Sequence, residues 1–137
     1  MLRQVRRFLE LHGEGRFTWW HRASDDHNTK TLQRAGMRRI VDDKGEPIKT
    51  QSIGTEYTPR MSAAHGDGVT VEYFVMAETF KTELCQGFDA QAVARVLLAH
   101  ECLIPSKGRT FDCKQRLFGM GPTWCYRIPA RIFELDL

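Results

Sequence analysis

The stretch Phe88-Asp-Ala-Gln-Ala-Val-Ala-Arg-Val-Leu-Leu-Ala-His100 decides the fold, because it is the clearest helix in the 137-residue chain. It is rich in Ala and Leu, which favour helices, and Asp89 stands where an N-cap residue is expected. Leu97 belongs to its apolar stripe, whereas Gln91 and Arg95 lie on another face of the helix. We therefore expect this helix to pack on a core through one side only.

Further elements are predicted on both sides of this helix. Apolar spacing over residues 2–12 predicts an amphipathic helix, and residues 77–85 predict a shorter one that ends before Gly87. After the long helix, alternating residues over 110–117 and 123–133 predict two strands of an antiparallel hairpin. The cations of the first strand fall on the side opposite its apolar residues.

The order of these elements is that of a winged helix, with three helices followed by a C-terminal β-hairpin wing. We therefore expect an α+β fold, a single winged-helix-like domain over residues 1–137. An inserted β-hairpin over 36–50 and a strand at 69–75 would form an insertion at about 34–75. Its residues at about 51–68 are polar, with glycine and proline but few periodic apolar residues, which predicts a flexible, mobile loop.

The composition is that of an ordinary soluble protein. Hydrophobic residues make up 42% of the chain and charged residues 27%, which excludes collagen-like, coiled-coil and mostly disordered chains. The longest apolar run, Tyr73–Ala77, is too short to cross a membrane. No long apolar stretch follows the charged first residues, so no signal peptide is visible. We expect a cytoplasmic protein without a membrane partner.

The four cysteines are Cys85, Cys102, Cys113 and Cys125. They form no C-x-x-C pair and no H-x-x-x-H accompanies them, so we expect free thiols, no metal and no cofactor. Cys113 and Cys125 lie twelve positions apart, a spacing that allows them to face each other across the two strands of the hairpin.

The net charge of +3 is unevenly distributed along the sequence. Residues 1–40 hold nine Lys or Arg and four Asp or Glu, giving +5; residues 41–80 hold three and seven, giving −4; residues 81–137 hold eight and six, giving +2. Basic ends around an acidic middle suit a polyanion partner, and they equally suit an ordinary solvated surface.

The sequence carries no recognisable catalytic constellation. Neither a phosphate-cradling G-x-x-x-x-G-K-[ST] loop nor a G-x-G-x-x-G motif is present. The cluster Asp25-Asp26-His27 is more typical of a solvated turn than of a metal site. Cys102 beside His100 lacks a third group that would activate a nucleophile. We therefore expect a protein that is not an enzyme.

The candidate functional residues are basic and amide side chains that a winged helix would turn toward nucleic acid. They are Gln91, Arg95, Lys107, Arg109, Lys114, Arg116, Arg3, Arg6 and Arg7. The long helix would enter the major groove and bond bases, while the wing and the first helix would contact phosphates. One arginine on an Ala-rich helix is a small recognition surface, so protein docking is the alternative.

Aromatic side chains gather in several predicted strands. They are Phe17, Trp19, Trp20, Tyr73, Phe74, Trp124 and Tyr126. Core packing is the expected role for this group. Trp19 and Trp20 are adjacent and point apart in an extended chain, so one of them can be exposed and stack on a base or on another domain.

Five short motifs occur in order along the chain. They are His12–Phe17, Trp19–Arg22, Arg34–Arg39, Glu72–Phe80 and Gly87–Ala94. In this order they resemble the C-terminal segment of the domain of unknown function 927 family, which points to primase-helicase-like proteins of phages, plasmids and integrative elements. The resemblance covers most of the chain except residues 51–68.

The resemblance implies an accessory C-terminal domain of a replication protein, with an ATPase domain upstream. This chain has no Walker motif, so no ATPase activity carries over, and its direct opening in a helix suits a fragment or a split gene. The implied partners are DNA and an upstream ATPase or helicase; a docking or oligomerisation module of such a helicase is the alternative. The family pattern expects a glycine two residues before Leu103, where this chain has Glu101.

Overall fold

The structure is a computed structural model, and it describes residues 1–19, 34–42, 46, 69–106, 110–117 and 121–136. Its helical elements are α1 (Leu2–His12), α3 (Ala77–Thr79), which runs directly into the π-helical turn η2 (Phe80–Leu84), α4 (Ala90–Ala99) and the 3₁₀ turn η3 (Ala130–Phe133). Its strands are β1 (Phe17–Trp19), β2 (Gly36–Asp42), β3 (Val69–Met76), β4 (Cys113–Leu117) and β5 (Gly121–Ile128).

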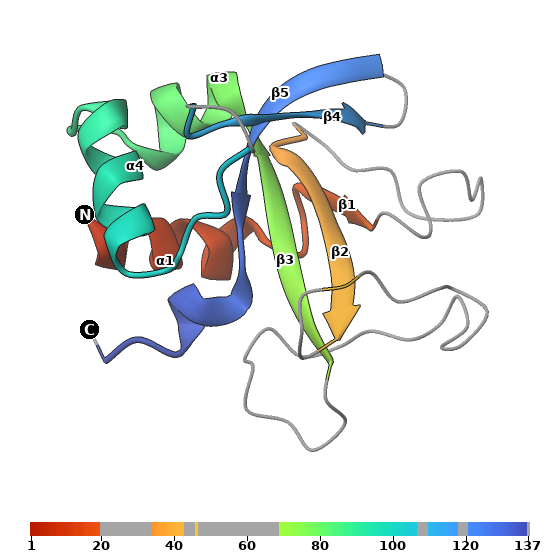
Figure 1. Cartoon of the computed structure of the whole chain (residues 1–137), viewed down its shortest axis with the longest axis horizontal. Helices are drawn as coiled ribbons and strands as arrows, with labels where there is room; N and C mark the ends of the chain where they lie inside the picture. The colour runs from red at the N-terminus through yellow and green to blue at the C-terminus, as the bar shows by residue number, and fades with distance from the viewer. Residues whose placement is uncertain (20–33, 43–45, 47–68, 107–109, 118–120, 137) are drawn as a thin grey trace.

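The five strands form one mixed sheet in the order β1-β2-β3-β5-β4 (Figure 1). β1 runs parallel to β2, and every other neighbouring pair is antiparallel. The chain is therefore α+β, as expected. The segment 34–75, expected as an insertion, supplies two inner strands of the sheet instead. β2 pairs with β3 along its whole length because both strands bury side chains on both faces.

Part of the expected insertion lies outside the described residues. This holds for the predicted return strand at 48–50 and for the loop at 51–68. The antiparallel partner of the strand at 36–41 among the described residues is β3, with Gly36 opposite Val75. A Cβ atom at Gly36 would lie 1.8 Å from the Phe74 carbonyl oxygen, so only glycine fits where β2 approaches β3.

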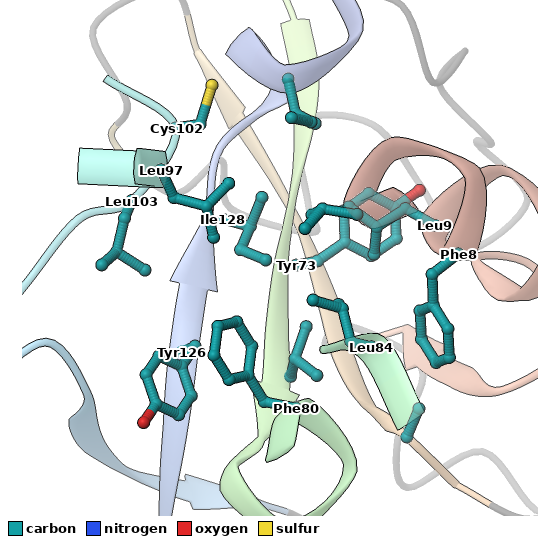
Figure 2. Close-up of a cluster of buried hydrophobic side chains, with 14 of the residues drawn as sticks. Phe8, Leu9, Tyr73, Phe80, Leu84, Leu97, Cys102, Leu103, Tyr126 and Ile128 are labelled. Carbon is teal, nitrogen blue, oxygen red and sulfur yellow. The ribbon is translucent and has the colours of Figure 1, made fainter. Parts of the chain in front are cut away.

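The main core lies between one face of the sheet and a layer formed by α1, η2 and α4 (Figure 2). β3 is the central strand, and its Val71, Tyr73 and Val75 point into this core with the period of two that a strand imposes. Leu97 of α4 is fully buried there, as the apolar stripe predicts. The Phe80 and Tyr126 rings stack at 3.8 Å between centroids, joining η2 to β5.

The predicted C-terminal hairpin is present as β4 and β5, but it is not a free wing. The second half of β5, Cys125–Ile128, pairs with β3 at Tyr73–Met76, whereas Gly121–Cys125 pairs with β4. β3 ends at Met76 because the chain turns into α3 there. The first half of β5 and its partner β4 therefore extend beyond the end of the central strand (Figure 1).

The ends of α4 follow the sequence signals in part. The Asp89 carboxylate caps the helix by accepting a hydrogen bond from the Ala92 backbone N–H at 3.0 Å. After the helix, Glu101 adopts a left-handed backbone with φ of 60°. The residue where the family resemblance expects glycine therefore has the conformation that favours glycine.

No helix in the described part of the chain is long and apolar enough to cross a bilayer.

Replacing Glu101 with glycine is expected to stabilise the protein. A residue with a Cβ atom in the left-handed region is strained by about 1 kcal/mol, and glycine relieves the strain at some cost in chain entropy. Glu101→Gly should raise the free energy of unfolding by roughly 0.5 kcal/mol in urea denaturation. Glu134→Gly, at an ordinary φ of −93°, is the matched control and should not stabilise. Equal effects of both changes would contradict this account.

Candidate nucleic-acid interface

The overhanging part of the hairpin presents two cations on one face. Lys114 and Arg116 of β4 are both exposed, whereas Cys113 of the same strand is buried, as the alternation in the sequence predicts. Lys114 lies directly opposite Trp124, and Arg116 lies directly opposite Pro122. The four side chains therefore share one face of the two strands, because opposed residues in a ladder point the same way.

Trp124 completes this face, and the expectation of core packing is wrong for it. Its exposed fraction is 47%, although the other described aromatic residues of the predicted group are buried. The Lys114 ammonium lies 6.0 Å from the centre of the Trp124 ring, at the limit of a cation–π contact. We name Lys114, Arg116, Pro122 and Trp124 the hairpin face.

The sequence contained a signal for the exposure of Trp124. Once Cys113 is placed opposite Cys125, residue 124 must stand opposite Lys114, on the side of the exposed cations. The side chain stays uncovered because the helical layer packs against the half of β5 that lies beside β3. Of the adjacent tryptophans, Trp19 is buried beneath the Arg38 guanidinium at 4.0 Å, and Trp20 lies outside the described residues.

The three predicted arginines of α1 differ in their surroundings. Arg3 and Arg7 are exposed. Arg6 is half-buried and donates a hydrogen bond of 2.8 Å to the Leu135 carbonyl oxygen, which ties α1 to the C-terminal segment. Arg7 borders a shallow hollow between α1 and η2, where the Gln4 amide donates to the Leu84 carbonyl oxygen at 2.8 Å. Arg6 therefore has a structural role in addition to its predicted one.

The predicted residues of α4 are exposed, but their surroundings are not strongly basic. Gln91 and Arg95 share the outer face of the helix with Leu98, which is 40% exposed. Lys107 and Arg109 lie outside the described residues. Figure 1 shows α4 at the left of the molecule and the far end of the hairpin at the right. The structure therefore distributes the described candidates over α1, α4 and the hairpin and does not gather them in one patch.

A buried ion-pair cluster occupies the sheet face away from the helices. The Glu72 carboxylate is 1% exposed, with one oxygen 2.7 Å from Arg39 on β2 and the other 3.0 Å from Arg127 on β5. Both guanidinium groups also lie over the Phe74 ring, at 4.9 and 5.7 Å. The cluster joins three neighbouring strands, and although Arg39 and Glu72 lie in the short motifs of the sequence, sequence reasoning assigned no ion pair to them.

Neither the side-chain clusters nor the comparisons identify a cofactor. Among the residues that the structure describes, no group of three or more His, Cys, Asp or Glu side chains is placed to hold a metal ion. Comparisons of the chain with protein-family models, with curated proteins and with solved structures gave no match.

Neutralising Glu72 is expected to destabilise the fold strongly. Glu72→Gln leaves two guanidinium groups in a largely buried site without their counter-charge, which should lower the free energy of unfolding by about 3 kcal/mol or more. Glu83→Gln breaks a similarly close pair with Arg16, at 2.7 Å, in which the glutamate is 44% exposed. That change should cost about 1 kcal/mol or less because water screens the pair. Chemical denaturation compares the two, and similar losses would contradict the structural role of Glu72.

Proposed function

We propose that this chain is a nucleic-acid-binding accessory domain of a mobile-element replication protein, and that it binds through the hairpin face. One observation supports the proposal most directly: an exposed tryptophan stands beside two exposed cations on the overhanging half of the hairpin. The resemblance to the domain of unknown function 927 family supports the biological setting, in which DNA and an upstream ATPase or helicase are the partners.

The chemistry of the hairpin face suits a nucleic-acid strand. Lys114 and Arg116 offer charge to phosphates, and each phosphate contact contributes about 0.7–0.9 to the slope of affinity against salt on logarithmic axes. The Trp124 ring offers a flat surface for a base, and such stacking contributes about 1–3 kcal/mol per base. Only an unpaired base exposes its ring to stacking, so the tryptophan favours single-stranded nucleic acid over a duplex.

The winged-helix interpretation adds a finer expectation to this proposal. In it α4 is the recognition helix and the β4–β5 hairpin is the wing, with Gln91 and Arg95 toward bases. The order of the elements and the exposure of both side chains support it. The anchoring of β5 to the central strand β3 makes the hairpin stiffer than a free wing, which would present the hairpin face in a fixed orientation.

Reversing the charge of the hairpin face should remove binding. The double variant Lys114→Glu/Arg116→Glu should abolish measurable affinity for an oligonucleotide in fluorescence anisotropy, with a nearly unchanged melting temperature, since both side chains are exposed. The variant Lys81→Glu/Arg131→Glu is the matched control, because it changes the net charge equally at two other exposed positions. It should retain binding except for a small long-range effect.

A salt titration with single- and double-stranded DNA of matched length completes this test. Phosphate contacts predict affinity that falls steeply as salt rises. Replacing both Lys114 and Arg116 by Gln is a milder change. It should lower the magnitude of the slope of log affinity against log salt concentration by about 1.4–1.8. Equal binding by the charge-reversed protein and the wild type would exclude the hairpin face as the contact surface.

Protein docking remains the second candidate function because the helices expose large apolar side chains. Leu11 is 67% exposed on α1, and Leu98 is 40% exposed on α4 beside Arg95. An interface through these helices would hold a helicase oligomer or a partner, and its affinity would depend little on salt. If Arg95→Ala leaves DNA affinity intact but breaks an oligomer or a partner complex, docking is the better account of α4.

A further inference from the structure

Two cysteines stand directly opposite each other under the hairpin face. The register of β4 and β5 pairs Cys113 with Cys125, next to the Lys114–Trp124 pair. Directly opposed residues of an antiparallel ladder have Cα atoms about 4.5–5.5 Å apart. A disulfide needs about 4.4–6.8 Å between Cα atoms. The register therefore meets the Cα spacing that a disulfide requires.

The two thiols are free and buried in the structure. The Cys125 thiol donates a hydrogen bond of 3.6 Å to the Cys113 carbonyl oxygen, and the Gln115 amide lies 3.9 Å from the Cys113 sulfur. Together with Phe74 the pair forms a small cluster on the sheet face away from the helices. β4 is the outermost described strand, so Cys113 lies at the edge of the sheet.

The environment makes the two thiols unequal. Pairing with the Cys125 side chain lowers the pKa of Cys113, while the same pairing and burial raise the pKa of Cys125. Cys85 and Cys102 lie in the main core, where burial raises their pKa to about 12 and about 11. Cys113 is therefore the one cysteine of the four whose pKa is lowered, which favours the thiolate, the attacking species in disulfide exchange.

We propose that Cys113 and Cys125 are a redox-active dithiol that closes to a cross-strand disulfide when it meets a small disulfide such as oxidised glutathione. The Cys113 thiolate attacks one glutathione sulfur, forms a mixed disulfide and releases the other glutathione as thiolate. Cys125 then transfers its proton to the released glutathione thiolate and attacks the Cys113 sulfur, which releases the second glutathione as a thiolate that solvent protonates. Two protein thiols become one disulfide, and one oxidised glutathione becomes two reduced molecules.

The roles of the two residues differ because of where each lies. Cys113, at the edge strand, has the lower pKa and is the attacking residue. Cys125 is completely buried on the inner strand and is the resolving residue. The dithiol does not depend on the nucleic-acid proposal, although it lies on the strands that carry the hairpin face and so gives that site a means of redox control.

The test equilibrates the reduced protein with buffers of varied ratio of reduced to oxidised glutathione. Acid quenching, alkylation of the remaining thiols and peptide mapping then identify the bonds. A disulfide between Cys113 and Cys125 should form as the buffer becomes more oxidising, while Cys85 and Cys102 in the same molecules stay reduced. No protein disulfide at any ratio, or a disulfide to either core cysteine, would overturn the proposal without any need for a variant.

Single serine variants test the assignment of roles. Cys125→Ser should accumulate glutathione on Cys113, because the resolving thiol is missing. Cys113→Ser should stay unmodified at Cys125, because the remaining thiol is buried and has a raised pKa. Circular dichroism confirms that each variant is folded before the reaction. Trapping of glutathione on Cys125 and not on Cys113 would contradict the assignment.

Discussion

The Glu72 carboxylate between Arg39 and Arg127 is the interaction on which the arrangement of the sheet depends most. It sits on the central strand β3, and its partners lie on the neighbouring strands β2 and β5. Burial of three charged groups is costly, so the cluster is stable only when both guanidinium groups reach the carboxylate. A slip of one residue in either ladder would turn a partner to the opposite face and leave the buried charge uncompensated.

The register that Glu72 fixes also positions the hairpin face. Because β5 is locked to β3 over Cys125–Ile128, the other half of the strand continues past the end of β3 in a defined direction. β4 follows it through the Cys113–Cys125 pair. The exposed tryptophan and cations thus stand on strands that are anchored in the sheet, so that little backbone freedom is lost on binding. The proposed dithiol lies at the junction between the half of β5 that pairs with β3 and the half that extends beyond it.

Local patterns in the sequence predicted the elements that depend on local physics. Periodic apolar residues and the Asp89 cap gave α4, and the alternation around Cys113 gave the hairpin and the exposure of Lys114. The arrangement of the sheet was not predicted, because β1 pairs in parallel with β2 and β3 becomes central through contacts distant in sequence. The role of Glu72 follows from that arrangement, so no local pattern could assign it, whereas the exposure of Trp124 was signalled only through the pairing of Cys113 with Cys125.

The most direct test of the account is a ¹H–¹⁵N correlation spectrum recorded while a single-stranded oligonucleotide is added, since it locates the contact on the folded protein. The Trp124 indole signal is assigned by its loss in Trp124→Phe. The account predicts that this indole and the backbone amides of residues 114–116 shift as binding saturates. Shifts confined to α4, with the Trp124 indole unmoved, would contradict the central claim.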